Sequence, residues 1–217
     1  MKLLLVRHGE STWNVEGRYQ GRRDAPLSPR GRAQAEALAA RLCDEQAARP
    51  NDKRVAAIVS SPLARAHDTA QICARALGLS VKVDERLTEI SHGQWEGKLG
   101  HEVASLWPDM VAAWRSRPHE VRFPGGETLQ DVRSRFVSFV STLQDDAEPL
   151  LATTHDVIVR IALLIAQGKP LSAFNDVRVD NAALNEFSVD GDKLAVVRIN
   201  DTTHLGSLRS DTLTQAL

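Results

Sequence analysis

The 217-residue sequence predicts an α/β fold: a three-layer α/β/α sandwich with a mostly parallel central sheet. Three short apolar runs lack the alternation of a half-exposed strand and are typical of strands buried on both faces. Each run is followed by a segment whose apolar residues recur at helical spacing. Strand and helix therefore alternate along the chain, which is the pattern of a parallel sheet covered by helices on both faces.

The N-terminal half contains two of these strand–helix units. Leu3 to Val6 is the first strand, and the helix of this unit is predicted to begin at Ser28-Pro29, because serine caps helix N-termini and proline suits the first helical position. Val55 to Val59 is the second strand. The next helix is expected to begin at Ser60-Ser61-Pro62 and to end at Gly78, since glycine favours the conformation that stops a helix.

The later elements are predicted on the same grounds. They are a strand at 81–83, a helix at 99–114 interrupted by Pro108, a helix at 128–143, a strand at 150–152, a helix at 157–166, and a hairpin of 184–189 with 194–199. The polar stretch from about residue 206 is expected to be loosely held. Residues 1–217 are interpreted as a single domain, in which the stretch at about 87–127 departs from the alternation and covers the functional site.

Composition and charge narrow the class of function. The formal net charge is -1, so no overall attraction to nucleic acid or to an acidic membrane is expected. Cys43 and Cys73 have no pattern of metal or disulfide partners, and we interpret them as free thiols of a reducing compartment. The first apolar run is too short for a signal peptide or a membrane span, and a cytoplasmic location is predicted.

Charged residues follow three of the predicted strands. Arg7-His8-Gly9-Glu10 comes after the first strand, Arg65 after the second, and Thr153-Thr154-His155 after the third. Open parallel sheets bind ligands beyond the carboxyl ends of their strands, so these side chains are expected to converge at one edge of the sheet. Two guanidinium groups there suggest a doubly charged oxyanion, because each can donate two parallel hydrogen bonds.

The two histidines are expected to play different parts at such an anion. A neutral imidazole can attack a phosphoryl group if one ring nitrogen is free and the other donates to a backbone carbonyl. His8 suits this role, since Gly9 gives the backbone room to turn around the ring. His155 would be a second, charged imidazole that stabilises the transferring phosphoryl group.

Five blocks of sequence stand in a recognisable order. They are Arg7 to Asn14 with its continuation through Gly21, Ser28 and Gln34-Ala35; Ser60 to Ala66; Leu87 to Ile90 with Gly93 to Gly97; Pro124 to Glu127; and Thr154-His155. In this order they resemble a phosphatase-type member of the histidine phosphatase superfamily, branch 1, which is phosphoglycerate-mutase-like. The resemblance covers the chain from Met1 to about Arg160. It implies a phosphatase that hydrolyses small-molecule phosphomonoesters through a phosphohistidine intermediate.

The resemblance also implies roles for individual residues. His8 resembles the nucleophile, and Glu89 resembles the proton donor to the leaving alcohol and later the base that activates water. The phosphate and substrate pocket is implied to consist of Arg7, Asn14, Gln20, Gly21, Arg65 and His155. General acid work near neutral pH requires a raised pKa of Glu89. Arginines and imidazolium supply the positive charge, so no metal and no cofactor is expected.

Two places depart from the family pattern. Asp156 stands where relatives usually have glycine after the second histidine. It either caps the following helix, or raises the pKa of His155, or contacts the substrate. Arg22-Arg23 replaces aromatic and small residues and belongs either to a solvated loop or to a site for a substrate carboxylate or second phosphate. His92 is a further candidate for specificity because of its nearness to Glu89.

Two other functions remain open from the sequence. A phosphoglycerate-type mutase resembles this chain around His8, but such mutases carry a longer basic insertion after the acid, where this chain has the short form Ile90 to Gly97. A non-catalytic phospholigand-binding module is the second alternative, although neither the nucleophile nor the acid is lost here. The sequence does not define the natural substrate. A homodimer is kept open because dimers are common among relatives.

Overall fold

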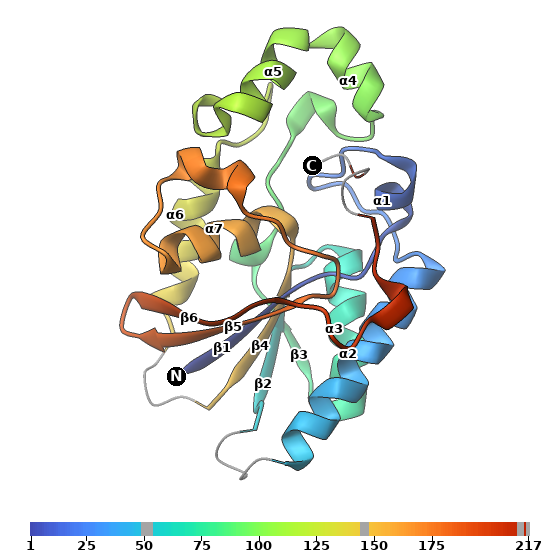
Figure 1. Ribbon diagram of the computed structural model, residues 1–217, viewed down its shortest axis with the longest axis vertical. Coiled ribbons are helices and arrows are strands. Elements are labelled where there is room, and N and C mark those ends of the chain that lie inside the picture. Colours follow the sequence, from blue (N-terminus) through green and yellow to red (C-terminus); the bar gives the residue numbers. More distant parts are fainter. Residues whose placement is uncertain (49–53, 144–147, 212–214, 216–217) are drawn as a thin grey trace.

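A mixed sheet forms the centre of the molecule (Figure 1). The computed structural model describes residues 1–48, 54–143, 148–211 and 215. Within them, one sheet has six strands in the order β3-β2-β4-β1-β5-β6, and β1 to β4 pair in parallel while β5 and β6 pair antiparallel. The strands are β1 (Lys2–Arg7), β2 (Ala57–Ser60), β3 (Val81–Val83), β4 (Leu150–Thr154), β5 (Leu184–Asp190) and β6 (Lys193–Asp201).

Helices cover both faces of this sheet, which confirms the three-layer prediction (Figure 1). One face carries α2 and α3, whose apolar residues share a core with Leu4, Ile58 and Leu151. The other carries α6 and α7, which share a core with Leu3 and Leu5. The helices are α1 (Thr12–Glu16), α2 (Pro29–Ala47), α3 (Ala64–Leu77), α4 (Gly100–Leu106), α5 (Pro108–Ser116), α6 (Leu129–Val140) and α7 (Asp156–Ala166).

Local sequence signals explain most helix ends. Ser28 caps α2 by accepting a hydrogen bond from the backbone N–H of Gly31, and Gly78 ends α3 in the left-handed conformation. The predicted start of α3 is wrong by a few residues. Leu63 is its N-cap and gives no side-chain cap, so Ser61 lies outside the helix and its hydroxyl is available for other contacts.

The parallel pairing of β1 with β4 sets the position of the two histidines. Arg7 lies opposite Thr154 in the register, and the backbone N–H of His8 donates to the Thr154 carbonyl at 2.9 Å. The next residue along β4 is His155, which is the N-cap of α7. The two imidazoles therefore lie side by side at the carboxyl edge, as expected for neighbouring parallel strands.

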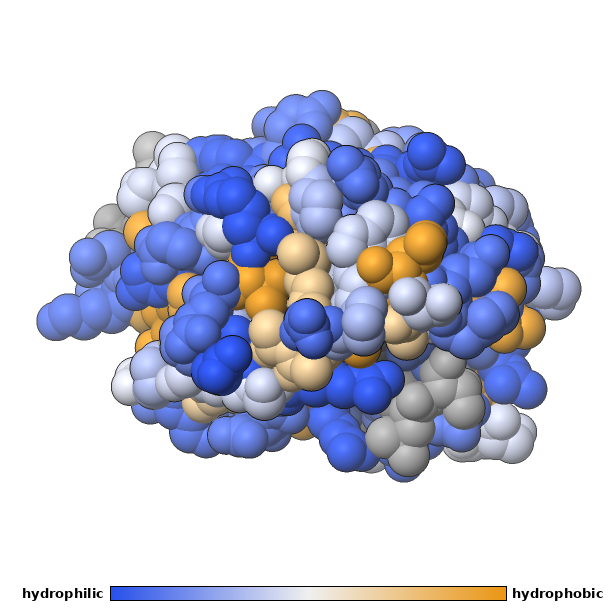
Figure 2. Space-filling model, turned by 90° about the horizontal axis from the view of Figure 1, so that it is seen from above, coloured by the Kyte–Doolittle hydropathy of each residue, from blue (hydrophilic) through white to orange (hydrophobic). Residues whose placement is uncertain are grey.

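The segment between β3 and α6 lies beyond this edge of the sheet. In Figure 1 it rises to α4 and α5 at the top of the molecule. Figure 2 views the molecule from this end and shows a mostly hydrophilic surface around a smaller apolar area. None of the helices in the described part of the chain has the length and apolar character that would let it cross a membrane.

The expectation that the chain is loosely held from about residue 206 is wrong for the part that the structure describes. Residues Gly206–Leu208 form a 3-10 turn, and the Leu208 carbonyl accepts a hydrogen bond from Gln34. Ser210 donates to the Glu10 carboxylate at 2.7 Å. In Figure 1 the turn at Gly206–Leu208 lies beside α2. Polar groups of this segment form hydrogen bonds with buried polar side chains of the first strand–helix unit, Glu10 and Gln34. A polar sequence by itself does not predict such contacts.

Candidate active site

The loop after β1 is pressed against the N-terminus of α2. A Cβ on Gly9 would lie 2.3 Å from the carbonyl oxygen of Gly31, and a Cβ on Gly31 would lie 1.9 Å from the carbonyl oxygen of Glu10. Both positions therefore require glycine. The reason for Gly9 is this close backbone approach to α2, and not room for a turn around the His8 ring.

His8 has the geometry predicted for a nucleophilic imidazole. Its Nδ1 lies 2.6 Å from the carbonyl oxygen of Gly9, so this nitrogen carries the proton, and Nε2 keeps its lone pair. Arg65 Nε donates to this Nε2 at 3.2 Å. Burial, followed by the positive charges of Arg65 and Arg7, lowers the pKa of His8 well below its ordinary value. The imidazole is neutral at physiological pH, as attack on phosphorus requires.

Two buried arginines flank His8, as the sequence predicts. Arg7 Nη1 donates to the carbonyl of Val179 at 2.7 Å, and Arg65 Nη2 donates to the carbonyl of Gly21 at 2.8 Å. Arg7 Nη2 donates to the side-chain oxygen of Gln215 at 2.5 Å. Backbone carbonyls thus fix Nη1 of Arg7 and both terminal nitrogens of Arg65, whose Nη1 donates to the carbonyl of Arg23, while the buried Nε of Arg7 has no hydrogen-bond partner in the described structure.

His155 packs edge-to-face on His8, with ring centroids 5.2 Å apart. Its Nε2 lies 2.7 Å from the hydroxyl of Ser61, while its buried Nδ1 has no hydrogen-bond partner in the described structure. Burial and the charges of Arg65 and other neighbouring cations lower the pKa of His155 well below its ordinary value. The prediction of a charged imidazole is therefore wrong for this structure, because burial and nearby cations both oppose protonation of His155.

Three polar residues of the first block complete this side of the pocket. The side-chain oxygen of Asn14 accepts from the backbone N–H of Ser11, and its Nδ2 donates to the oxygen of Gln215 at 3.1 Å. Gln20 holds its oxygen 2.8 Å from the Ser11 hydroxyl. Gly21, with φ +53, presents its carbonyl to Arg65. The amide nitrogens of Asn14 and Gln20 are donors suited to phosphate oxygens.

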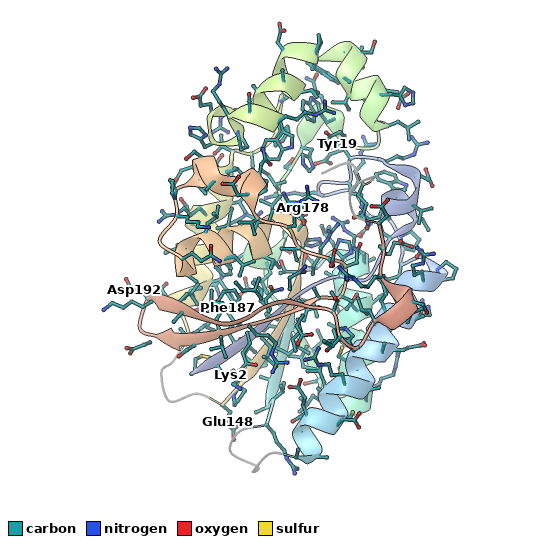
Figure 3. The ribbon with its side chains drawn as sticks, in the orientation of Figure 1. Lys2, Tyr19, Glu148, Arg178, Phe187 and Asp192 are labelled. Carbon is teal, nitrogen blue, oxygen red and sulfur yellow. The ribbon has the colours of Figure 1, made fainter. Side chains whose placement is uncertain are left out.

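The segment after β3 supplies Glu89 and His92. The carboxylate of Glu89 accepts from the backbone N–H of Ile90 at 2.9 Å, and burial, followed by the charge of Asp156, raises its pKa to about 7. Both ring nitrogens of His92 are buried without a hydrogen-bond partner in the described structure, and burial and Arg65 lower its pKa to about 3. Tyr19, labelled in Figure 3, packs edge-to-face on His92 with centroids 5.3 Å apart.

One small pocket brings most of the predicted residues together. It is lined by Arg7, His8, Asn14, Gln20, Gly21, Arg65, Glu89 and His92. The side chains of Arg22 and Arg23 are not among those that line it. Arg22 is half exposed and pairs with Glu127 at 2.9 Å, and the carbonyl of Arg23 accepts from Arg65 at 3.0 Å. Within the described residues, no group of three or more histidine, cysteine or acidic side chains could hold a metal ion.

Asp156 is placed differently from each of its predicted roles. It is the first residue of α7 and not the N-cap, which is His155. The pKa of His155 is lowered and not raised. The Asp156 carboxylate is 2% exposed and lies 3.3 Å from Arg7 Nη1 and 2.7 Å from Arg160 Nε. Asp156 therefore contacts Arg7, which lines the pocket, and does not itself line it.

Comparison with known proteins agrees with this geometry. The family model of the histidine phosphatase superfamily (branch 1) matches residues 3–202. The chain belongs to this superfamily. Phosphoserine phosphatase 1 of Hydrogenobacter thermophilus is 36% identical over 208 residues, which cover 95% of each chain. The solved structure of YhfR from Bacillus stearothermophilus has a TM-score of 0.85 at 32% identity, covering 94% of this chain and 98% of that one.

A third relative extends the comparison to another phosphatase. The mycobacterial glucosyl-3-phosphoglycerate phosphatase, solved in complex with VO3, has a TM-score of 0.80 at 28% identity, covering 92% of this chain and 99% of that chain. Two of these three relatives, those of Hydrogenobacter thermophilus and of the mycobacterium, are named phosphatases. The protein is a histidine phosphatase that hydrolyses small-molecule phosphomonoesters.

Two residues of this histidine phosphatase site were not predicted from the sequence. Ser61 holds the ring of His155, and its doubled-serine block was attributed to a helix start. Gln215 lies 208 positions from Arg7 in the chain, in a polar stretch with no motif. The only signal for Ser61 was its place directly after a buried strand, and we find no sequence signal for Gln215.

Proposed function

We propose that His8 is the nucleophile of this histidine phosphatase and that hydrolysis proceeds in two steps without a metal ion. The observation that carries the proposal is the state of the His8 ring. Nδ1 is held by the Gly9 carbonyl, Nε2 carries the lone pair to which Arg65 Nε donates, and the lowered pKa keeps the ring neutral. A phosphoryl group placed between Arg7 and Arg65 would meet Nε2 with its negative charge balanced by two guanidinium groups.

In the first step, His8 Nε2 attacks phosphorus and the bond between phosphorus and the ester oxygen breaks. The departing oxygen takes the proton of the Glu89 carboxyl and leaves as an alcohol. A pKa of about 7 gives Glu89 a substantial protonated fraction at neutral pH, which an ordinary glutamate would lack. The products are phospho-His8 and an ionised Glu89.

In the second step, the Glu89 carboxylate removes a proton from water, and the hydroxide formed attacks phosphorus. The bond between phosphorus and Nε2 breaks, inorganic phosphate is released, and Glu89 is protonated again. His155 would direct its unpaired Nδ1 at the phosphoryl oxygens in both steps. The phosphate dianion opposes the effect of the surrounding arginines, so we expect His155 to become protonated when phosphate is bound.

For the substrate, we propose a small alkyl phosphomonoester, with O-phosphoserine as the first candidate. A relative 36% identical to this chain is named a phosphoserine phosphatase. A neutral His92 offers one N–H donor and one nitrogen acceptor, both without partners in the described structure. These would suit the carboxylate and the ammonium group of a serine leaving group. We keep the interpretation that the stretch at about 87–127, which carries His92, covers the site.

The test is a panel of phosphometabolites and an aryl phosphate, assayed with EDTA, for the parent and His8→Ala. We expect EDTA-resistant hydrolysis of phosphoserine that His8→Ala abolishes, together with acid-labile labelling of the parent by phosphate. His92→Phe keeps the shape of the ring and should raise KM for phosphoserine several-fold, leaving the aryl phosphate unaffected. Hydrolysis that EDTA removes would refute the metal-free mechanism. Transfer to a second hydroxyl would favour the mutase alternative, and binding without turnover the phospholigand-binding module.

A further inference from the structure

Asp156 is one of the two places at which this chain departs from the pattern of the family, and its side chain is buried beside Arg7, which lines the phosphate pocket. Its carboxylate lies between two guanidinium groups, Arg7 on β1 and Arg160 one turn further along α7. The Arg160 group in turn lies 5.0 Å from the ring centroid of Phe174. Burying a carboxylate costs free energy unless cations pair with it. The buried Asp156 carboxylate therefore depends on its ion pairs with Arg7 and Arg160.

Asp156 contacts one particular nitrogen of the Arg7 guanidinium group, Nη1. Arg7 Nη1 donates a hydrogen bond to the carbonyl of Val179 at 2.7 Å. Its 3.3 Å approach to Asp156 is an ion pair, because Asp156 Oδ1 has no hydrogen-bond partner in the described structure. The opposite nitrogen, Nη2, reaches the oxygen of Gln215, to which Asn14 also donates. Asp156 and Val179 therefore hold Nη1, the inner edge of the guanidinium group, and Gln215 holds Nη2, while Arg7 lines the pocket.

We propose that Asp156 is a positioning residue: it anchors the inner edge of Arg7 and places a fixed negative charge behind a pocket whose other fixed charges are mainly positive. This inference rests on the proposed roles of His8 and Glu89. The fixed charge acts on Glu89, the proton donor of the proposed mechanism. A like charge nearby disfavours ionisation of a carboxyl group, so Asp156 favours the protonated form that can donate.

The other groups around Glu89 act in both directions. The charged or titratable side chains that face it are Arg7 from β1, His8 after β1, Arg65 from α3, His92 from its own segment, Arg135 from α6, and Asp156 from α7. Arg65 and Arg135 lower the pKa of Glu89, whereas burial and Asp156 raise it to about 7. Asp156 is the only acidic side chain in this set of described residues, and it offsets arginines that would otherwise ionise the proton donor.

The test uses two substitutions that separate charge from anchoring. Asp156→Asn removes the charge but keeps an oxygen beside Arg7, while Asp156→Ala removes both. The control is Asp109→Asn, which removes an exposed acid from the first turn of α5, far from the pocket. For each variant, kcat/KM is measured against pH with phosphoserine and with p-nitrophenyl phosphate, whose leaving group needs no proton. Circular dichroism and melting temperature establish that the variants are folded.

For Asp156→Asn with phosphoserine, we expect the alkaline limb of the kcat/KM profile to move down by about one pH unit, because it reports the protonated fraction of Glu89 in the free enzyme. The profile with p-nitrophenyl phosphate should not move. Asp156→Ala should show the same displacement and a further loss of about tenfold with both substrates, because Arg7 loses its anchor. Identical profiles for Asp156→Asn and the parent would overturn the proposal, as would equal effects on the two substrates.

A second measurement does not require turnover. The free energy of unfolding, measured from pH 5 to pH 8, falls with pH by the cost of ionising Glu89 in the folded protein. This cost should be smaller in Asp156→Asn than in the parent, and an unchanged pH dependence would also overturn the proposal. A parent enzyme without His8-dependent hydrolysis would instead refute the proposed function, and the pH dependence of unfolding would still decide the electrostatic role of Asp156.

Discussion

Replacing Glu89 by glutamine is expected to stabilise the folded protein at alkaline pH and to have almost no effect at acid pH. The side chain is 6% exposed, and its carboxylate accepts one hydrogen bond from the backbone N–H of Ile90. Glutamine keeps this acceptor and nearly the same volume, but it never ionises. The substitution therefore removes the cost of burying a charge and little else.

The size of the effect follows from the pKa of Glu89, which rises from 4.5 to about 7 on folding. Between these values the folded state holds one proton more than the unfolded state, so the free energy of unfolding falls by about 1.4 kcal/mol for each pH unit gained. An interval of roughly 2.5 units corresponds to about 3 kcal/mol. The loss is complete above pH 7 and absent below pH 4.5, and Glu89→Gln should recover it.

The assay is urea denaturation of the parent and Glu89→Gln at four or five pH values between 4.5 and 8.5. The matched control is Glu36→Gln, the same chemical change at an exposed position of α2. The difference in unfolding free energy between Glu89→Gln and the parent should grow with pH and level off near pH 8. A difference that is constant with pH would refute the reasoning, because a lost or gained contact without titration gives that result. Activity of this variant should fall even though its stability rises.

Three further substitutions test the arrangement around the pocket. Ser61→Ala should lower kcat about fivefold without moving the pH profile, since the loss of one orienting hydrogen bond to His155 costs about 1 kcal/mol; an unchanged kcat would show that packing alone holds the ring. Gly31→Ala should destabilise the protein by about 3 kcal/mol, as measured by urea denaturation, because its Cβ would lie 1.9 Å from a carbonyl oxygen of Glu10; a loss below about 1 kcal/mol would contradict this. Arg22→Ala should change kcat/KM less than about twofold for both phosphoserine and p-nitrophenyl phosphate, because the half-exposed ion pair with Glu127 is worth little. A rise in KM for phosphoserine alone would instead support substrate recognition by Arg22.

The sequence predicted the strands, the helices other than α1, and the convergence of Arg7, His8, Arg65 and His155 because those signals are local. Buried strands, caps and breakers depend on residues a few positions apart, and the rule for the carboxyl edge of a parallel sheet then brings distant strand ends together. Glu89 and His92 lie on irregular backbone, where no periodicity applies. Glu89 was expected in the pocket from the resemblance, and His92 was a candidate only because of its nearness to Glu89. Both line the pocket in the structure.

Contacts across long stretches of chain could not be predicted in the same way. Gln215 donates to Asn181 at 2.9 Å and accepts from Arg7, yet its surroundings in the sequence are indistinguishable from an ordinary polar tail. Asp156 illustrates the same limit. Its place at the start of a helix suggests a cap, and only the position of Arg7 on the neighbouring strand shows that the carboxylate has a cationic partner.

The contacts of the two imidazole rings also explain how two histidines with the same side chain can take opposite parts in the proposed mechanism. Burial and the two arginines lower the pKa of both rings, so both are neutral before substrate binds. The difference lies in the second nitrogen. The proton of His8 is committed to the Gly9 carbonyl, whereas His155 leaves Nδ1 unpaired and has a hydroxyl at Nε2, which can either donate or accept. His8 can therefore offer a lone pair to phosphorus, and His155 can offer a proton to the phosphate oxygens. The hydrogen bond of His8 to the Gly9 carbonyl and that of His155 to the Ser61 hydroxyl determine these two roles.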